Sequence, residues 1–293
     1  GVCMYASCMH MHIPICPTKA NASCQFLLRP DSVKRTGSPR VMAFSFGVQR
    51  LALPVCGRRS LHFISAVKML PSPERRSGSD GHDAVLATPT CVAVADGVGG
   101  WEREGVDPAG YSRGLLNSLG ELVRQHSKIP PEGVSFQDLA NLVDQAQQKL
   151  VGVRGSCTLT VASLSEEHQD AISVGTTQLM HQGEQPCSSH RLQVLNIGDS
   201  GFMFLSSDGK ERLFSEPQVH DFNFPFQLGS GTEFSSPEDG DLWTHTARPK
   251  DFLLLFTDGI SGNLHANEIA EICDNHLQRL EVGGSLNHCP LVE

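Results

Sequence analysis

Three aspartates of the sequence each come directly after an apolar run that is typical of a buried strand. Asp96 is followed by Gly97, Asp199 by a serine and Asp258 by another glycine. Buried strands would hold these carboxylates with little freedom, and glycine lets its own backbone carbonyl approach a ligand closely. Two carboxylates about 5 Å apart repel by about 3 kcal/mol at an effective dielectric near 20, and a divalent cation removes that cost. Because all-oxygen ligation selects hard ions, convergence of the three side chains would indicate a Mg²⁺ or Mn²⁺ site.

The same residues also have an ordinary interpretation, which their spacing leaves open. An Asp-Gly or Asp-Ser pair after a strand is common in turns, where the Asp side chain bonds its own loop. For any single aspartate the turn is the better interpretation. For three aspartates that all end apolar strands, the pattern favours neither interpretation.

The hydrophobic pattern predicts the strands and helices that would position these aspartates. Strand-like runs follow one another at hairpin length and are interrupted by one pair of amphipathic helices, which indicates an α+β fold with antiparallel sheets. Helices are predicted over residues 108–124, from residue 135 to about residue 150, and from about residue 266. Strands are predicted over residues 61–67, 84–88, 90–95, 156–164, 171–175, 191–197, 201–206, 211–214 and 252–256.

The overall composition limits the classes of partner. Hydrophobic residues make up 39% of the chain and charged residues 19%, as in ordinary globular proteins. The net charge of −9 argues against a nucleic-acid partner, because phosphate binding needs clustered Lys and Arg. No apolar run approaches the roughly 18 residues of a membrane span. The ten cysteines are interpreted as reduced, because a chain with a sizeable core does not need disulfides.

Residues 1–58 differ from the rest of the chain. They carry seven Lys and Arg residues against the single acid Asp31, whereas the remainder is strongly acidic. Such a composition is typical of an organelle transit peptide, and equally of a disordered basic tail. The sequence therefore predicts a basic, Cys-rich leader over residues 1–58 and a folded domain over residues 59–293.

Three segments of this domain resemble signature motifs of the metal-dependent protein phosphatases, the PPM or type 2C family. They are ADGVGGW at residues 95–101, NIGDSGF at residues 196–202 and TDGI at residues 257–260, in the family's order. The resemblance runs from about residue 60 to residue 277. It implies the family's fold, a four-layer α-β-β-α sandwich of two antiparallel sheets flanked by helices.

Further segments resemble one branch of that family, which includes mitochondrial and other organelle-targeted phosphatases. MLPSP at residues 69–73 precedes GHDA at residues 81–84, and HDFNFPFQL covers residues 220–228. Together with the basic leader, this resemblance implies a location in the mitochondrial matrix or another organelle. The alternative is the cytoplasm.

The resemblance also implies a role for each acidic residue. Asp96 would bridge two metal ions, and the carbonyl of Gly97 would ligate one of them. Asp258 would ligate the other ion, so Asp96 and Asp258 are the expected catalytic residues. Asp199 would serve a third, more weakly held ion, and Asp83 would lie beside the two-metal centre.

The implied activity is hydrolysis of phosphoserine and phosphothreonine in phosphoproteins. Two Mg²⁺ or Mn²⁺ ions lower the pKa of a shared water, orient it toward phosphorus and neutralise charge on the phosphoryl oxygens. No covalent phosphoenzyme is needed, so the cysteines need no catalytic role.

Several departures from the family pattern favour an alternative function. His82 stands where the family has a carboxylate, and is interpreted as a solvent-facing loop residue. Val98 stands where many members have a histidine. The phosphate-binding arginine is not clearly placed, although Arg75 and Arg76 are candidates. The alternative is a catalytically impaired, phosphatase-like binding module.

The largest departure concerns the end of the chain. The family closes with a strand that carries another metal-ligating aspartate, and residues 278–293 contain no such motif. We therefore expect the last strand to be missing and Asp258 to lack its partner ligand. A neighbouring strand would then have unpaired backbone groups, each costing about 1–3 kcal/mol, and the fragment is expected to be poorly active.

Overall fold

Two antiparallel five-stranded sheets form the centre of the molecule. The computed structural model describes residues 2–9, 61–69, 81–126, 136–167, 189–231 and 233–281. The strand order of the first sheet is β13 (Asp241–Ala247), β7 (Ser189–Ile197), β6 (Leu159–Glu167), β4 (Cys91–Ala95) and β3 (Ala84–Ala87). The strand order of the second sheet is β2 (His62–Met69), β1 (Val2–Met9), β14 (Phe252–Phe256), β8 (Gly201–Leu205) and β9 (Arg212–Phe214).

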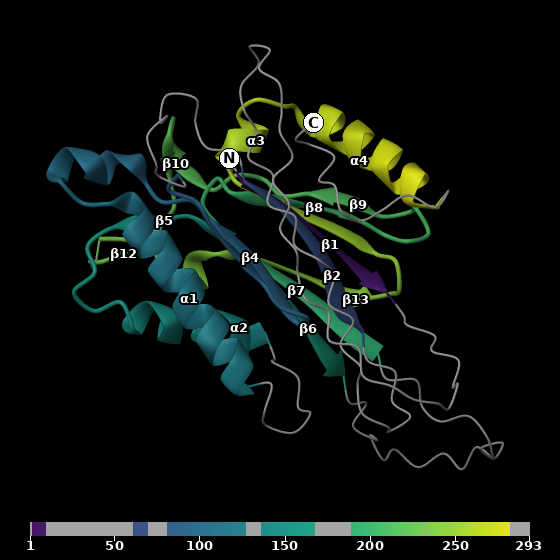
Figure 1. Ribbon diagram of the computed structural model, residues 1–293, viewed down its shortest axis with the longest axis horizontal. Coiled ribbons are helices and arrows are strands. Elements are labelled where there is room, and N and C mark those ends of the chain that lie inside the picture. Colours follow the sequence, from purple (N-terminus) through teal and green to yellow (C-terminus); the bar gives the residue numbers. More distant parts are fainter. Residues whose placement is uncertain are drawn as a thin grey trace, which may run out of the picture.

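Helices cover the outer faces of both sheets, which gives four layers (Figure 1). The pair α1 (Pro108–His126) and α2 (Phe136–Gln148) packs on the first sheet, and α4 (Ala266–Glu281) packs on the second. The smaller elements are β5 (Ser156–Cys157) paired with β12 (Leu228–Gly229), β10 (Val219–Asp221) paired with β11 (Phe224–Pro225), the short helix α3 (Asp258–Ser261), and the 3₁₀ helices η1 (Gly99–Glu104) and η2 (Pro237–Asp239). None of the helices described here is both long and apolar enough to cross a membrane.

Strand alternation explains why each sheet is buried on both faces. In β4, Cys91, Ala93 and Ala95 belong to the core beneath α1 and α2. Val92 and Val94 belong to the core between the two sheets. Successive side chains of a strand point to opposite faces, so five consecutive apolar residues fill two cores at once.

Helix α1 presents one apolar stripe to the first sheet. Leu115, Leu119 and Leu122 recur at intervals of three to four residues and are all buried. This spacing puts them on one face of a helix, which therefore gains most of its stability from packing rather than from helix propensity.

The predicted four-layer arrangement is confirmed. The strand predicted at 252–256 has the same bounds as β14, and the helix predicted at 108–124 ends two residues later as α1. Strand β13 was not predicted, because its run DLWTHTA is largely polar. The strand predicted at 171–175 lies outside the described residues.

Strand β1 comes from the segment that was predicted to be a leader. It pairs with β14 on one side and with β2 on the other. Within the described strands, β14 therefore has a partner on both sides, since β8 pairs with its other edge. The expectation that the interior of this sheet would have unpaired backbone groups is thus wrong for β14. The remainder of the leader, residues 10–58, lies outside the described residues.

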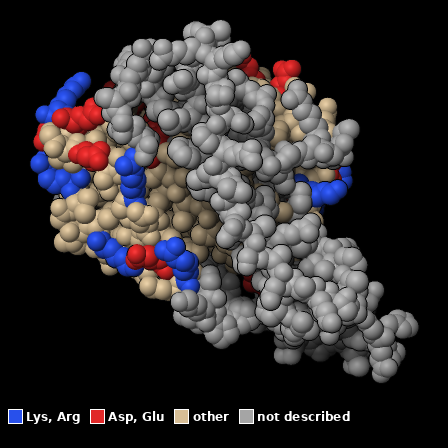
Figure 2. Space-filling view, viewed as in Figure 1, with Lys and Arg blue, Asp and Glu red and all other residues tan. Residues whose placement is uncertain are grey.

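Charges of both signs are mixed on one face of the molecule. Figure 2 shows Lys and Arg side chains next to Asp and Glu side chains on the described part of this face. The described residues also include close pairs of opposite charge: Lys149 lies 3.6 Å from Glu121, and Arg154 is paired with Glu104. This part of the face does not have the continuous basic surface that nucleic-acid binding needs.

Candidate active site

The register of the first sheet brings two of the predicted aspartates together. Ala84 of β3 is paired with Ala95 of β4. The residues just beyond this pair, Asp83 and Asp96, therefore leave the two strands side by side at the same end of the sheet.

The other two aspartates lie at the end of the second sheet, and Asp199 is in the loop that joins β7 of the first sheet to β8 of the second. Gly201 of β8 is paired with Phe256 of β14. Asp199 comes two residues before the paired glycine, and Asp258 comes two residues after the paired phenylalanine at the start of α3. Antiparallel pairing thus places these carboxylates at one end of the second sheet.

The two pairs of aspartates lie close to each other at adjacent ends of the two sheets. The pKa of Asp96 is raised well above its usual value, first by burial and then by the nearby carboxylates of Asp83 and Asp258, which are also within hydrogen-bonding reach. The pKa of Asp199 is raised to about 6, first by burial and then by the charge of Asp258. The four predicted aspartates therefore form one cluster, and Asp258 is its exposed member.

Gly97 has no room for a side chain. A Cβ atom there would lie 2.5 Å from the carbonyl oxygen of Pro108 and 2.9 Å from that of His82. The N–H of Gly97 donates to the carbonyl of His82 at 3.2 Å. The glycine thus lets the loop after β4 pass closely beneath the start of α1, a packing role that does not depend on a ligand.

His82 is not the solvent-facing residue that was expected. Its side chain is 12% exposed, and its Nε2 lies 3.0 Å from Oε1 of Glu102. Its carbonyl also accepts a hydrogen bond from the hydroxyl of Ser112 on α1. The exposure prediction failed because it ignored α1 and η1, which pack against this loop.

Thr158 links the loops that carry aspartates of the two sheets. Its N–H donates to the carbonyl of Asp96 at 2.9 Å, and its hydroxyl is 2.6 Å from the hydroxyl of Ser200. Both hydroxyls are buried, so this contact is protected from water. Sequence reasoning did not single out Thr158, and nothing in its local motif indicates that it contacts Ser200.

The donor set of the cluster fits a hard divalent cation. All four side chains offer carboxylate oxygens, which Mg²⁺ and Mn²⁺ prefer. Every cause acting on Asp96 raises its pKa, and no Lys or Arg is among them. Within the described ranges, no three Asp, Glu, His or Cys side chains are already arranged around one point as ion ligands. Ion binding would therefore require the carboxylates to reorient.

Comparison with known proteins decides the family. A family model described as protein phosphatase 2C matches residues 74–288, which is well over half of the chain. The chain belongs to the protein phosphatase 2C family.

The similar proteins agree with this assignment. "Probable protein phosphatase 2C 55" of Arabidopsis thaliana is 31% identical over 216 residues, which cover 73% of this chain and 39% of the relative. "Protein phosphatase PTC7 homolog" of Xenopus laevis is 31% identical over 184 residues, which cover 60% of this chain and 54% of the relative. The chain thus spans about half or less of the length of these relatives.

A solved structure supports the fold. The X-ray structure of the photosystem II phosphatase PBCP has a TM-score of 0.52 and 23% identity, and the match covers 70% of each chain. At this level of identity the likeness establishes the architecture alone.

Two of the departures from the protein phosphatase 2C pattern can be placed in the structure. Val98 follows Gly97, and its N–H donates to the carbonyl of Ser156 at 3.0 Å. An apolar side chain at this position offers no proton to a leaving group. The candidate arginines Arg75 and Arg76 lie outside the described residues.

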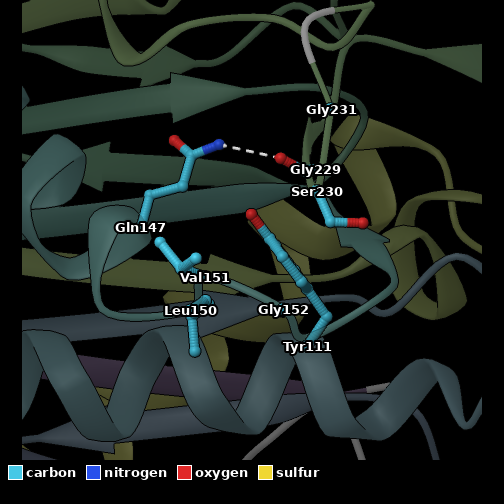
Figure 3. Close-up of a pocket in the computed structure, with 8 residues that line it drawn as sticks. All are labelled: Tyr111, Gln147, Leu150, Val151, Gly152, Gly229, Ser230 and Gly231. Atoms are coloured by element: carbon cyan, nitrogen blue, oxygen red, sulfur yellow. Dashed lines mark hydrogen bonds between the residues drawn. The ribbon is translucent and has the colours of Figure 1, made fainter.

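A pocket elsewhere in this protein phosphatase 2C domain has a different chemistry. It lies between α1, the end of α2 and the segment after β12, as Figure 3 shows. Its lining residues are Tyr111, Gln147, Leu150, Val151, Gly152, Gly229, Ser230 and Gly231. None of them is charged, so this pocket offers no carboxylate to a divalent cation and no Lys or Arg to a phosphate. The aspartate cluster is therefore the candidate active site.

Proposed function

We propose that the chain is the catalytic domain of a metal-dependent protein serine/threonine phosphatase. The observation that carries this proposal is the meeting of Asp83, Asp96, Asp199 and Asp258 from two different sheets. A structural protein gains nothing from bringing several acids together in a partly buried cluster, because each raises the energy of the others. Such a cluster is expected where a cation is bound as part of the function.

The residues of the chain would have separate tasks in this reaction. Asp83, Asp96 and Asp258, with the carbonyl of Gly97, would hold two Mg²⁺ or Mn²⁺ ions, and Asp199 would hold a third more weakly. Bound ions of this kind supply a water of lowered pKa and neutralise the phosphoryl group. The exposed position of Asp258 leaves one side of the cluster open, so a phosphoserine on a protein surface can reach it.

Loss of the central carboxylate tests the proposal. Asp96→Asn in the full-length protein should lower the Mn²⁺-dependent hydrolysis of a phosphoserine peptide by a factor of at least about 100, since it would remove an anionic ligand of the ions. The matched control is Asp144→Asn on α2, which changes a half-buried carboxylate that accepts a hydrogen bond from Gln148 and is not among the groups that shift the pKa of Asp96 or Asp199. Hydrolysis that continues undiminished in the presence of a chelator would contradict the metal-dependent mechanism.

A binding module without catalysis is the second candidate function. It is favoured by His82, which replaces a carboxylate of the family pattern and whose ring is engaged by Glu102. It is also favoured by Val98, which cannot act as an acid. The wild-type protein would then bind the phosphoserine peptide in Mn²⁺ without releasing phosphate.

We also propose that the protein works in mitochondria or another organelle. This rests on the basic composition of residues 1–58 and on the resemblance to an organelle-targeted branch. Its substrates would then be phosphoproteins of that compartment, and the cytoplasm remains the alternative.

A further inference from the structure

The large apolar side chains that are most exposed gather on one hairpin. Phe222 is 96% exposed, Phe224 is 53% exposed and Val219 is 46% exposed. They lie on the hairpin formed by β10 and β11, which we call the aromatic hairpin (residues 219–225). Among the described residues only Val151 has a comparable exposure, at 89%, and it lies far away in sequence after α2.

The aromatic hairpin has a defined shape. Asn223 occupies the left-handed region with φ of 55°, and the side chain of Asp221 accepts a hydrogen bond from the N–H of Phe222 at 2.7 Å. The ring of His220 stacks on the ring of Phe226 at 4.1 Å, with an angle of 13° between them. These contacts support the turn and the base of the aromatic hairpin, and Phe222 and Phe224 are left exposed.

The base of the aromatic hairpin is bonded directly to the loop that carries Asp199. The N–H of Gln218 donates to the carbonyl of Gly198 at 2.9 Å. The N–H of Gly198 donates in turn to Oε1 of Gln218 at 3.3 Å. A Cβ on Gly198 would lie 2.4 Å from the carbonyl oxygen of Phe226, so the two segments touch. In Figure 1, β10 rises from the same end of the sheets as α3, which begins with Asp258.

The size of this surface fits a transient partner better than a second copy of the chain. A Phe side chain buries about 150–250 Å² when it is fully covered, whereas a stable interface needs about 800 Å² on each partner. Two phenylalanines and a valine fall short of that area. Their hairpin is bonded at its base to the loop that carries Asp199, so the chain around a bound phosphoserine can contact them.

We propose that the aromatic hairpin binds the phosphoprotein substrate through a large apolar side chain close to the phosphorylated residue. This inference rests on the proposed phosphatase function and adds to it a preference for substrate sequence. Phe222 and Phe224 supply the contact, and the bonds between Gln218 and Gly198 keep it at a fixed distance from the cluster. A small aryl phosphate does not reach the aromatic hairpin, so its hydrolysis does not depend on these side chains.

The test compares two substrates and three proteins. The substrates are a phosphoserine peptide with leucines on either side of the phosphoserine and the same peptide with those leucines replaced by serine. The proteins, all full-length, are the wild type, the double variant Phe222→Ser/Phe224→Ser, and the control Val151→Ser, which removes an equally exposed apolar side chain elsewhere. Hydrolysis of p-nitrophenyl phosphate in Mn²⁺ is measured for each protein.

The expected result is a selective loss. The double variant loses about tenfold in kcat/KM on the leucine peptide, as expected for one well-covered apolar contact. Its preference for that peptide over the serine peptide disappears, while p-nitrophenyl phosphate hydrolysis is unchanged. Val151→Ser behaves as the wild type on all substrates.

Other outcomes would overturn the proposal. Unchanged kcat/KM of the double variant on the leucine peptide would show that the aromatic hairpin does not bind substrate. An equal loss on p-nitrophenyl phosphate would show that it only supports the Asp199 loop. If the wild type forms a concentration-dependent dimer and the double variant does not, this surface binds a second copy of the chain instead of the substrate. If the wild type hydrolyses neither peptide, the proposed phosphatase function is wrong, and the proposal for the aromatic hairpin is tested separately. Fluorescence anisotropy of the two labelled peptides then measures whether the protein prefers to bind the leucine peptide.

Discussion

The negative charges of Asp96 and Asp199 destabilise the folded, metal-free protein, whereas the proposed function needs these charges to bind a cation. Burial and neighbouring carboxylates raise the pKa of both groups. A raised pKa of an acid means that the folded protein holds its proton more tightly than the unfolded chain does. Ionisation of these groups therefore lowers the stability of the metal-free protein, and cation binding can reverse that loss.

Asp199→Asn should make the metal-free protein more stable at neutral pH. The pKa of Asp199 is about 6 in the folded state against 3.8 as the ordinary value. Below about pH 4 the carboxyl group is protonated in both the folded and the unfolded state, so it does not lower the stability. The destabilisation grows as the pH rises to about 6, and it reaches its full size above that pH. The variant should melt a few degrees higher than the wild type at about pH 7.5 in chelator and equally at about pH 3.5.

Added Mn²⁺ provides the second readout of that experiment. The melting temperature of the wild type should rise more with Mn²⁺ than that of Asp199→Asn, because the variant would lack one of the proposed ligands. Asp144→Asn should follow the wild type throughout. A variant that melts lower than the wild type in chelator would mean that Asp199 makes a stabilising bond whose loss outweighs its charge.

The aspartates could be predicted from the sequence, whereas most of their neighbours could not. Each aspartate follows a strongly apolar strand, and that local pattern is visible without a structure. Thr158 contacts Ser200, and Glu102 contacts His82. The members of each pair are distant in sequence, so no local pattern predicts these contacts. Sequence alone therefore predicted the charged groups that the structure brings into one cluster, but not the hydrogen bonds around them.

At the scale of elements, β1 is the least expected part of the fold. Five of its residues pair with β14, from Cys3 with Phe256 to Ser7 with Phe252. β14 leads directly to Asp258, so β1 supports a strand that positions the site. Its other edge pairs with β2 along its whole length.

Removal of residues 1–9 should lower the stability of the domain. β2 would lose its partner β1, and β14 would lose one of its two partners, and unpaired backbone groups are costly when buried. We expect the melting temperature to fall by about 5 °C or more. Removal of residues 285–293, which belong to no described strand, is the matched control. An unchanged melting temperature after loss of residues 1–9 would show that β1 contributes nothing to the sheet.

Elements with a strong internal period were predictable, and elements defined by their partners were not. The apolar run of β14 and the leucine stripe of α1 have patterns of their own. β13 contains Thr244 and His245, and it is a strand because β7 offers it a free edge. β1 lies in a basic, Cys-rich segment and is likewise specified by its pairing with β2 and β14. Pairing between distant segments is a tertiary effect that local propensity does not encode.

At the scale of the whole molecule, the charge asymmetry of the chain predicts where it works. Residues 1–58 fused to a fluorescent protein should direct it to mitochondria or another organelle, because several arginines with almost no acids are typical of transit peptides. Fluorescence microscopy with an organelle marker measures this. Replacing Arg29, Arg35 and Arg40 by Gln is the control that should abolish import. A diffuse cytosolic signal from the unaltered segment would assign it to an untargeted tail.

The distribution of the aspartates over two sheets has a mechanical consequence. Asp83 and Asp96 are attached to the first sheet and Asp258 to the second, whereas Asp199 lies in the loop that joins β7 of the first sheet to β8 of the second. The side chains that keep the sheets apart, Val94 among them, therefore act as spacers that set how far the two halves of the site stand from each other. A change of volume deep in this middle layer would alter ion affinity at a distance, without touching a single ligand.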